Sequence, residues 1–148
     1  MIDDLNKTIL MEFQKDASVT YRDLAKKIGE PASTVFARIK QMKDSGIIKQ
    51  IIPIVSPEAL GKTTTAWIKI SLEIDTDCCD FADEVAKNRK IMEVYEIAGE
   101  WDILLKVKVE DNLALHDLTK EISKVPGIKN MVSMIAFKTV KEDPRINL

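Results

Sequence analysis

The chain has 148 residues, of which 45% are hydrophobic and 31% charged, and its formal net charge is −2. This is the composition of an ordinary globular protein with room for one domain or two small ones, and it excludes an intrinsically disordered chain. No apolar run approaches the ~20 residues that cross a membrane, and the opening MIDDLNKTIL lacks the basic and apolar regions of a signal peptide. We therefore expect a cytoplasmic protein with no membrane partner.

The first 46 residues are predicted to form three helices. Asp3 or Asp4 can cap the first, whose apolar stripe is Leu5, Ile9, Leu10 and Phe13. Residues 20–42 are then predicted to form two short helices, and Ser18 and Thr20 can cap the first of them. Gly29 supplies the turn between them, and Pro31 takes the first position of the second helix. That last helix carries an apolar stripe at i, i+4 and i+7, formed by Val35, Ile39 and Met42.

The outer face of the third predicted helix carries side chains that are typical of a DNA-recognition helix. Small, hydroxylic, amide and basic groups on an exposed helix suit the major groove. Residues 18–50 carry seven Lys or Arg against three acids, a local net charge of +4 in a chain that is acidic as a whole. A plain helical bundle is the alternative. The candidate DNA-binding residues are Tyr21, Arg22, Ala32, Ser33, Thr34, Phe36, Ala37, Arg38, Lys40, Gln41 and Lys43.

Residues 47–61 are predicted to link this helix-turn-helix domain (1–46) to a second domain (62–148). A strand at 47–52, ended by Pro53, would form a small wing or an arm that pairs with another copy, and residues 56–61 a turn or a single helical turn. From Lys62 the apolar period changes to two. Strands are predicted at 62–74, 91–98, 102–109 and 128–140, and helices at 77–87 and from Asp111 or Asn112 to the stop at Pro126.

The order of these elements predicts an α+β fold class. An N-terminal helix-turn-helix (winged-helix-like) domain is followed by a βαββαβ domain, which right-handed crossovers close into a ferredoxin-like sheet with both helices on one face. The other face has no cover within the chain and predicts a second copy as partner. The apolar residues expected on it are Trp67, Tyr95, Ile97, Leu104, Met131, Ile135 and Phe137.

Several stretches in the right order resemble the archaeal and bacterial Lrp/AsnC (feast/famine) transcription regulators. LAKKIGEPASTVFARIKQMKDSGIIKQ is similar to their recognition unit, VYEIAGEWDILLKV to two effector-domain strands joined by a Gly-x-x-Asp loop, and VPGIKNMVSMIAFKTVK to the last strand. Glu30 and Pro31 stand where the family has an apolar residue and a capping Ser, which predicts a weaker N-cap. The family's pattern implies a homodimer that assembles into a tetramer or octamer.

The resemblance also implies a small-molecule effector, often an amino acid, bound between dimers. A loop with backbone donors and two carboxylates suits the carboxylate and ammonium of a zwitterion, although Gly99 and Asp102 can equally serve the turn alone. The candidate effector residues are Gly99, Glu100, Trp101, Asp102 and Ser133. Two other functions stay open, an Lrp-like enzyme of the tetrapyrrole decarboxylase type and an architectural DNA-binding protein without an effector.

The sequence offers no catalytic or metal site. His116 is the single histidine, and Cys78 and Cys79 lack the further Cys or His residues that a metal would need. A redox switch at these cysteines is not favoured, because no basic residue beside them in the sequence would lower the pKa of a thiol. We find no nucleophile–base pair, so the expectation is a non-enzymatic protein without cofactor.

Overall fold

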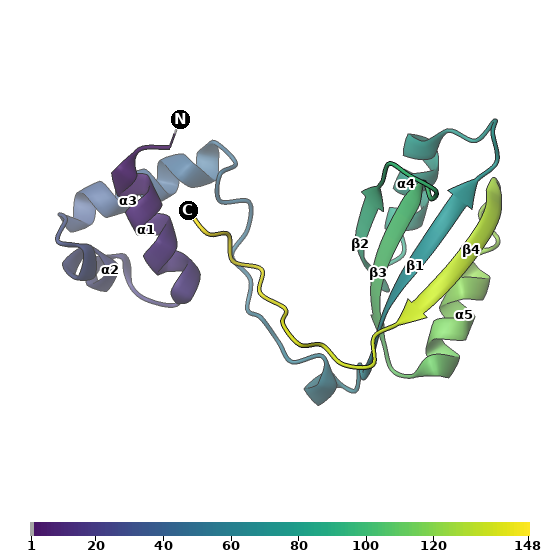
Figure 1. The fold of residues 1–148 in the computed structure, drawn as a ribbon. Coiled ribbons are helices and arrows are strands. Elements are labelled where there is room, and N and C mark those ends of the chain that lie inside the picture. Colours follow the sequence, from purple (N-terminus) through teal and green to yellow (C-terminus); the bar gives the residue numbers. More distant parts are fainter. Residues whose placement is uncertain (1) are drawn as a thin grey trace. The chain divides into compact units, whose positions relative to one another are not determined.

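The computed structural model describes residues 2–148. Its contacts divide the chain into two units, which Figure 1 labels by element. The helical unit comprises residues 2–54 together with Glu142–Leu148, and the sheet unit comprises Val55–Lys141. Each is described below by itself. None of the helices in the described residues is long and apolar enough to span a membrane.

The helical unit contains the three predicted helices, α1 (Asp4–Lys15), α2 (Tyr21–Ile28) and α3 (Ala32–Asp44). Asp3 caps α1 by accepting from the Asn6 N–H at 2.8 Å, and Thr20 caps α2 by accepting from the Asp23 N–H at 3.1 Å. The apolar stripes of the three helices meet in one buried core, formed by Ile9, Leu10, Phe13, Leu24, Ala25, Val35, Ile39 and Met42.

Two residues form the turn between α2 and α3, Gly29 at the end of the first helix and Pro31 at the start of the second. Gly29 ends α2 with φ of 77°, a left-handed conformation that glycine adopts without the clash of a side chain. Pro31 is the N-cap of α3, so the helix begins at Ala32, one residue later than predicted, and no side chain caps it. The weak N-cap predicted from Glu30 and Pro31 is therefore confirmed, and the first N–H groups of α3 are left for other acceptors.

Residues 47–52 form no wing within the single chain, and their pairing as an arm with another copy stays a prediction. Within the described residues this segment begins with a bend and belongs to no ladder, because no second strand lies beside it to supply the backbone hydrogen bonds. Its side chains are largely exposed, with Ile52 at 63% and Ile54, just beyond it, at 77%. The single helical turn predicted after it is present as the 3₁₀ turn η1 (Glu58–Leu60).

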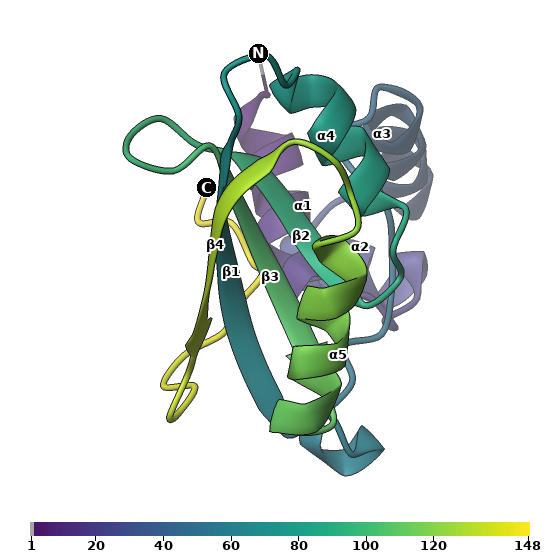
Figure 2. The same cartoon turned by 90° about the vertical axis from the view of Figure 1, so that its right-hand side faces the viewer.

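The sheet unit has the predicted βαββαβ order, with β1 (Thr64–Leu72), α4 (Cys78–Ala86), β2 (Ile91–Glu96), β3 (Ile103–Val109), α5 (Asn112–Ile122) and β4 (Ile128–Ile135). The strands lie in the order β2-β3-β1-β4, all neighbours antiparallel. Figure 2 shows α4 and α5 on the same face of this sheet. The predicted fold class is confirmed.

The core of the sheet unit lies between the sheet and its two helices. Alternate residues of β1 and β3 point into it, as the period of two predicts. The fully buried side chains there include Ile68, Ile70, Ile103, Leu105 and Leu118. Two strands end earlier than predicted. The first was expected to reach residue 74, but β1 ends at Leu72, where its register with β4 shifts. The last was expected to reach residue 140, but β4 ends at Ile135. Ile74, expected inward, is fully exposed in the turn that follows.

The β4 residues predicted to lie on the open face are wrong, because the alternation of the strand is shifted by one residue. Met131 pairs with Ile70 and Ile135 with Ala66, so both belong to the face that the helices cover. Val132 and Met134 occupy the open face in their place, opposite Lys69 and Trp67. The sequence MVSMI is apolar in both phases, and therefore its hydrophobicity alone could not fix the register.

The C-terminal tail packs on the helical unit. The side-chain amide of Gln14 on α1 pairs with the backbone of Ile146, accepting from its N–H at 2.8 Å and donating to its carbonyl oxygen at 3.0 Å. This two-bond contact joins residues that are 132 positions apart in the sequence. The last seven residues thus belong to the same unit as the helix-turn-helix, although the chain reaches them through β4.

Candidate DNA-binding and effector sites

The outer face of α3 is open along its length. Ser33, Ala37, Lys40 and Gln41 are exposed, whereas Val35, Ile39 and Met42 on the opposite side are at most 1% exposed. The buried stripe fixes the rotation of the helix, so Ser33, Ala37, Lys40 and Gln41 share one accessible surface. Among the described residues Lys40 has no ion-pair partner, and its charge is available to a phosphate.

Three basic residues of the helical unit, one of them a candidate DNA-binding residue, are paired with acids. Arg38 lies half-buried and pairs with Asp3, the N-cap of α1, at 2.5 Å. The hydrogen bond from the Asn6 N–H and the Arg38 guanidinium hold the pKa of Asp3 below its usual value. Lys26 pairs with Asp23 and Lys27 with Glu12. Arg38 therefore ties α3 to α1, a structural role that the helical phase alone could not reveal.

Aromatic side chains connect the core to the surface of the helix pair. Tyr21 packs against the buried Phe13 at a ring-centroid distance of 6.3 Å and against Phe36 at 5.8 Å, both in tilted geometry. Lys43 donates to the Tyr21 hydroxyl at 3.2 Å. Phe36 remains 53% exposed at the outer end of this row. Tyr21, Phe36 and Lys43, all predicted DNA contacts, thus form one surface patch.

Residues 99–102 lie in the connection between β2, which ends at Glu96, and β3, which begins at Ile103. Asp102 is built into the sheet, because its carboxylate accepts from the Leu72 N–H at 2.8 Å and its own N–H donates to the Ile70 carbonyl at 3.0 Å. The Trp101 ring lies under the Lys69 ammonium at 4.7 Å, on the open side of the sheet. Gly99 and Glu100 are exposed and donate no backbone hydrogen bond within the described chain.

Within one chain, Ser133 does not join this loop. It pairs with Ile68 and lies on the helix-covered side of β4, whereas Trp101 and Lys69 lie on the open side. The four loop residues are together, and the fifth predicted effector residue is separated from them by the sheet. A site that contains all five would need residues from more than one copy.

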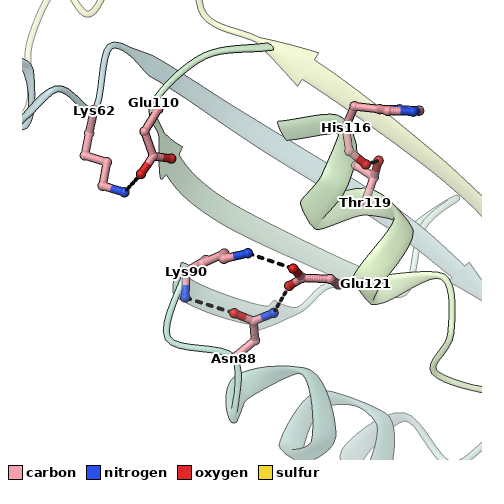
Figure 3. Close-up of polar contacts among 7 residues, drawn as sticks. All are labelled: Lys62, Asn88, Lys90, Glu110, His116, Thr119 and Glu121. Atoms are coloured by element: carbon pink, nitrogen blue, oxygen red, sulfur yellow. Dashed lines mark hydrogen bonds and ion pairs between the residues drawn. The ribbon is translucent and has the colours of Figure 1, made fainter. Parts of the chain in front are cut away.

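A polar network closes the end of the sheet unit near β2 and α5 (Figure 3). The Lys90 ammonium donates to Glu121 at 2.7 Å and the Asn88 amide to the same carboxylate at 3.1 Å. These hydrogen bonds hold the pKa of Glu121 below its usual value. Lys62 pairs with Glu110 nearby. Every charge in this network has an opposite partner, which indicates a solvated structural cluster.

The groups considered for chemistry in the sequence have no catalytic setting. His116 is exposed on α5, and its imidazole points away from the network (Figure 3). Burial raises the pKa of the Cys78 thiol, and a hydrogen bond with Glu96 raises that of Cys79. Both shifts oppose thiolate formation. No group of three or more His, Cys, Asp or Glu side chains in the described part of the chain could hold a metal.

The fold and the surface of α3 together define a class, that of helix-turn-helix transcription regulators with a separate ligand-binding domain. Residues 2–49 match the family model of winged helix-turn-helix DNA-binding domains. Residues 65–146 match the model of the Lrp/AsnC ligand binding domain. The chain belongs to the Lrp/AsnC family, as its sequence motifs predicted.

Similar proteins agree along the whole chain. The HTH-type transcriptional regulator FL11 of Pyrococcus abyssi is 33% identical over 141 residues, 95% of this chain and 93% of its own. The structure of Escherichia coli AsnC matches with a TM-score of 0.87 at 28% identity, covering 96% of each chain. A transcriptional regulator of Neisseria meningitidis in complex with L-Met matches with a TM-score of 0.91 at 25% identity, covering 99% of this chain and 97% of that one.

Proposed function

We propose that this regulator binds specific DNA sequences through the outer face of α3 and that an amino acid modulates the binding. The observation that carries the DNA part is the exposed face of α3, where Ser33, Ala37 and Gln41 lie beside the unpaired Lys40. Hydroxyl and amide groups on such a helix can read base edges, and lysines neutralise phosphates. The proposed place of action is the cytoplasm, where the chromosome lies.

The test of phosphate binding is the salt dependence of DNA affinity. Each phosphate contact contributes about one unit to the slope of log affinity against log salt concentration. Lys40→Gln should weaken binding to operator and random DNA alike and reduce the slope by about 0.9. Lys120→Gln on α5, an equal change of charge in the sheet unit, is the matched control and should leave the slope unchanged. Equal slopes for Lys40→Gln and wild type would refute the contact.

The effector proposal rests on the loop of residues 99–102 and on the L-Met complex of the Neisseria regulator. Exposed backbone donors suit an α-carboxylate, and the Glu100 carboxylate suits an α-ammonium. Calorimetry with the twenty amino acids on wild type and Glu100→Gln tests this site without disturbing the Asp102 hydrogen bonds. Equal affinity of a bound amino acid for both proteins would place the site elsewhere, and no binding at millimolar concentration would refute amino-acid sensing.

We propose a second copy of the chain as the cover of the open sheet face, with dimers assembling further into tetramers or octamers. Several apolar side chains lie on this face, among them Trp67, Leu104, Val132 and Met134. Leu104→Lys would bury an unpaired ammonium in such an interface and should give a monomer in sedimentation experiments. Leu113→Lys, at an exposed position on α5, is the matched control. A Leu104→Lys protein that sediments like wild type would refute this interface.

A further inference from the structure

Phe36 is the exposed large apolar residue of α3. The other large apolar side chains of this helix face the core and are at most 1% exposed, whereas the Phe36 ring is 53% exposed. Single apolar side chains on a surface are common and need no function. What distinguishes this ring is the way in which the protein holds it.

The ring is supported from the core outward. Phe13 is 5% exposed, Tyr21 packs on it with an interplanar angle of 59°, and Phe36 packs on Tyr21 at 58°. The Lys43 ammonium donates to the Tyr21 hydroxyl and fixes the middle ring from the other side. Tilted ring contacts of this kind restrict the side chain before any partner arrives. A restricted apolar group loses little entropy when it is buried by a ligand.

The surroundings of the ring indicate which ligand fits it. Phe36 and Lys40 are four residues apart on α3, with Lys43 a further three along the same stripe, so the ring shares its stripe with two exposed lysines. One ring among lysines is too small and too polar in its setting for a protein interface. The major groove of DNA, by contrast, offers such a setting, because the C5-methyl group of thymine lies on the base edge in the groove and phosphates line the two strands on either side.

We propose that Phe36 contacts a thymine C5-methyl group and thereby makes thymine the preferred base at one position of each half-site. The inference rests on the proposed binding of DNA by α3 and names one feature of the sequence that α3 reads. Tyr21 is the positioning residue, since it supports the ring without reaching the base itself.

The experiment removes the methyl group and the ring in turn. DNA selected from a random library by the full-length wild-type protein is resynthesised with each thymine replaced singly by deoxyuridine, which differs only by that methyl. At one position per half-site the wild type should lose about fourfold in affinity, the equivalent of burying one methyl group at ~0.8 kcal/mol. Phe36→Ala should bind the thymine and uracil forms of that site equally.

Two further variants and a cross-link show that the result does not come from misfolding. Phe36→Leu keeps an apolar group against Tyr21, and it should fold by circular dichroism and show a reduced preference for thymine. Leu113→Ala, which removes an exposed apolar side chain on α5, is the control and should keep the wild-type preference. In wild type, 5-iododeoxyuridine at the sensitive position should cross-link to Phe36 on irradiation.

The outcomes separate the two proposals. If no sequence is selected, DNA reading by α3 fails and this inference fails with it. If a sequence is selected but no thymine methyl matters to the wild type, only the thymine contact is refuted. A methyl preference that persists in Phe36→Ala, or a cross-link that forms elsewhere and not at Phe36, also refutes it.

Discussion

Asp102 is expected to stabilise the sheet unit whether or not it binds an effector. Its carboxylate accepts from the half-buried Leu72 N–H at 2.8 Å, where β1 ends beside the hairpin loop. Asp102→Ala removes this acceptor but keeps the two backbone hydrogen bonds of residue 102, to Ile70 and Ile97. The variant therefore leaves one backbone donor without its partner inside an otherwise intact sheet end.

The size of the loss follows from this single contact. A hydrogen bond to a charged group contributes about 1.5–3 kcal/mol, and partial access of water to the freed N–H favours the lower end of that range. We expect Asp102→Ala to lower the free energy of unfolding of the sheet unit by about 2 kcal/mol. Asp102→Asn keeps a carbonyl oxygen of the same reach and should lose less than about 1 kcal/mol.

Tryptophan fluorescence can measure this loss in the full chain. The two tryptophans, Trp67 and Trp101, both belong to the sheet unit, so their signal follows its unfolding in urea. Glu100→Ala, next in the loop and exposed, is the control and should change little. If Asp102→Ala unfolds at the same urea concentration as wild type, the hydrogen bond does not stabilise the unit and the structural account of Asp102 is wrong.

Three more predictions concern contacts that the sequence did not reveal. Gly127→Ala should destabilise the sheet unit by about 2–4 kcal/mol in urea, because its φ is +96° and a Cβ would lie 2.4 Å from Thr76 Oγ1, whereas Gly61→Ala, with φ of +74° and open space, should lose about 1 kcal/mol. Gln14→Ala should speed amide exchange in residues 142–148 roughly fivefold, since about 1 kcal/mol of anchoring is lost. The raised pKa of Cys79 should slow its alkylation at pH 7 relative to a free cysteine.

Each of these has a result that would contradict it. Equal losses for the two glycine variants would mean that Thr76 moves aside without cost. Unchanged exchange in the tail would show that contacts other than Gln14 hold it. Alkylation of Cys79 at the rate of a free cysteine would show that the neighbouring carboxylate does not suppress its thiolate.

The sequence predicted most of the fold because local signals and packing agree. The apolar stripe of α3, the caps Asp3 and Thr20 and the period of two in β1 each point to the element observed. The errors occur where local sequence signals and packing do not agree. The apolar residues of β4 fit either phase, and the segment 47–52 has strand composition but no strand beside it in the single chain.

The candidate sites were less predictable, because their chemistry depends on contacts across the fold. Helical phase placed Arg38 near the DNA-facing surface, but its ion pair with Asp3 exists only once α1 packs on α3. The sequence suggested Asp102 as an effector-binding residue, and the structure shows that its carboxylate also accepts a hydrogen bond from the Leu72 N–H, thirty residues away. The anchoring of the tail by Gln14 likewise had no signal in the local pattern.

The reading of DNA sequence by α3 is tested most directly by the specificity ratio of Gln41→Ala. Affinities of the full chain for selected DNA and for random DNA are measured at one salt concentration, for wild type and for the variant. Gln41 is exposed on the outer face of α3, where its amide can make a bidentate contact with a base. Its loss should weaken binding to the selected site roughly 5- to 150-fold and leave random DNA unaffected. Equal losses on both DNAs would contradict base reading by this helix.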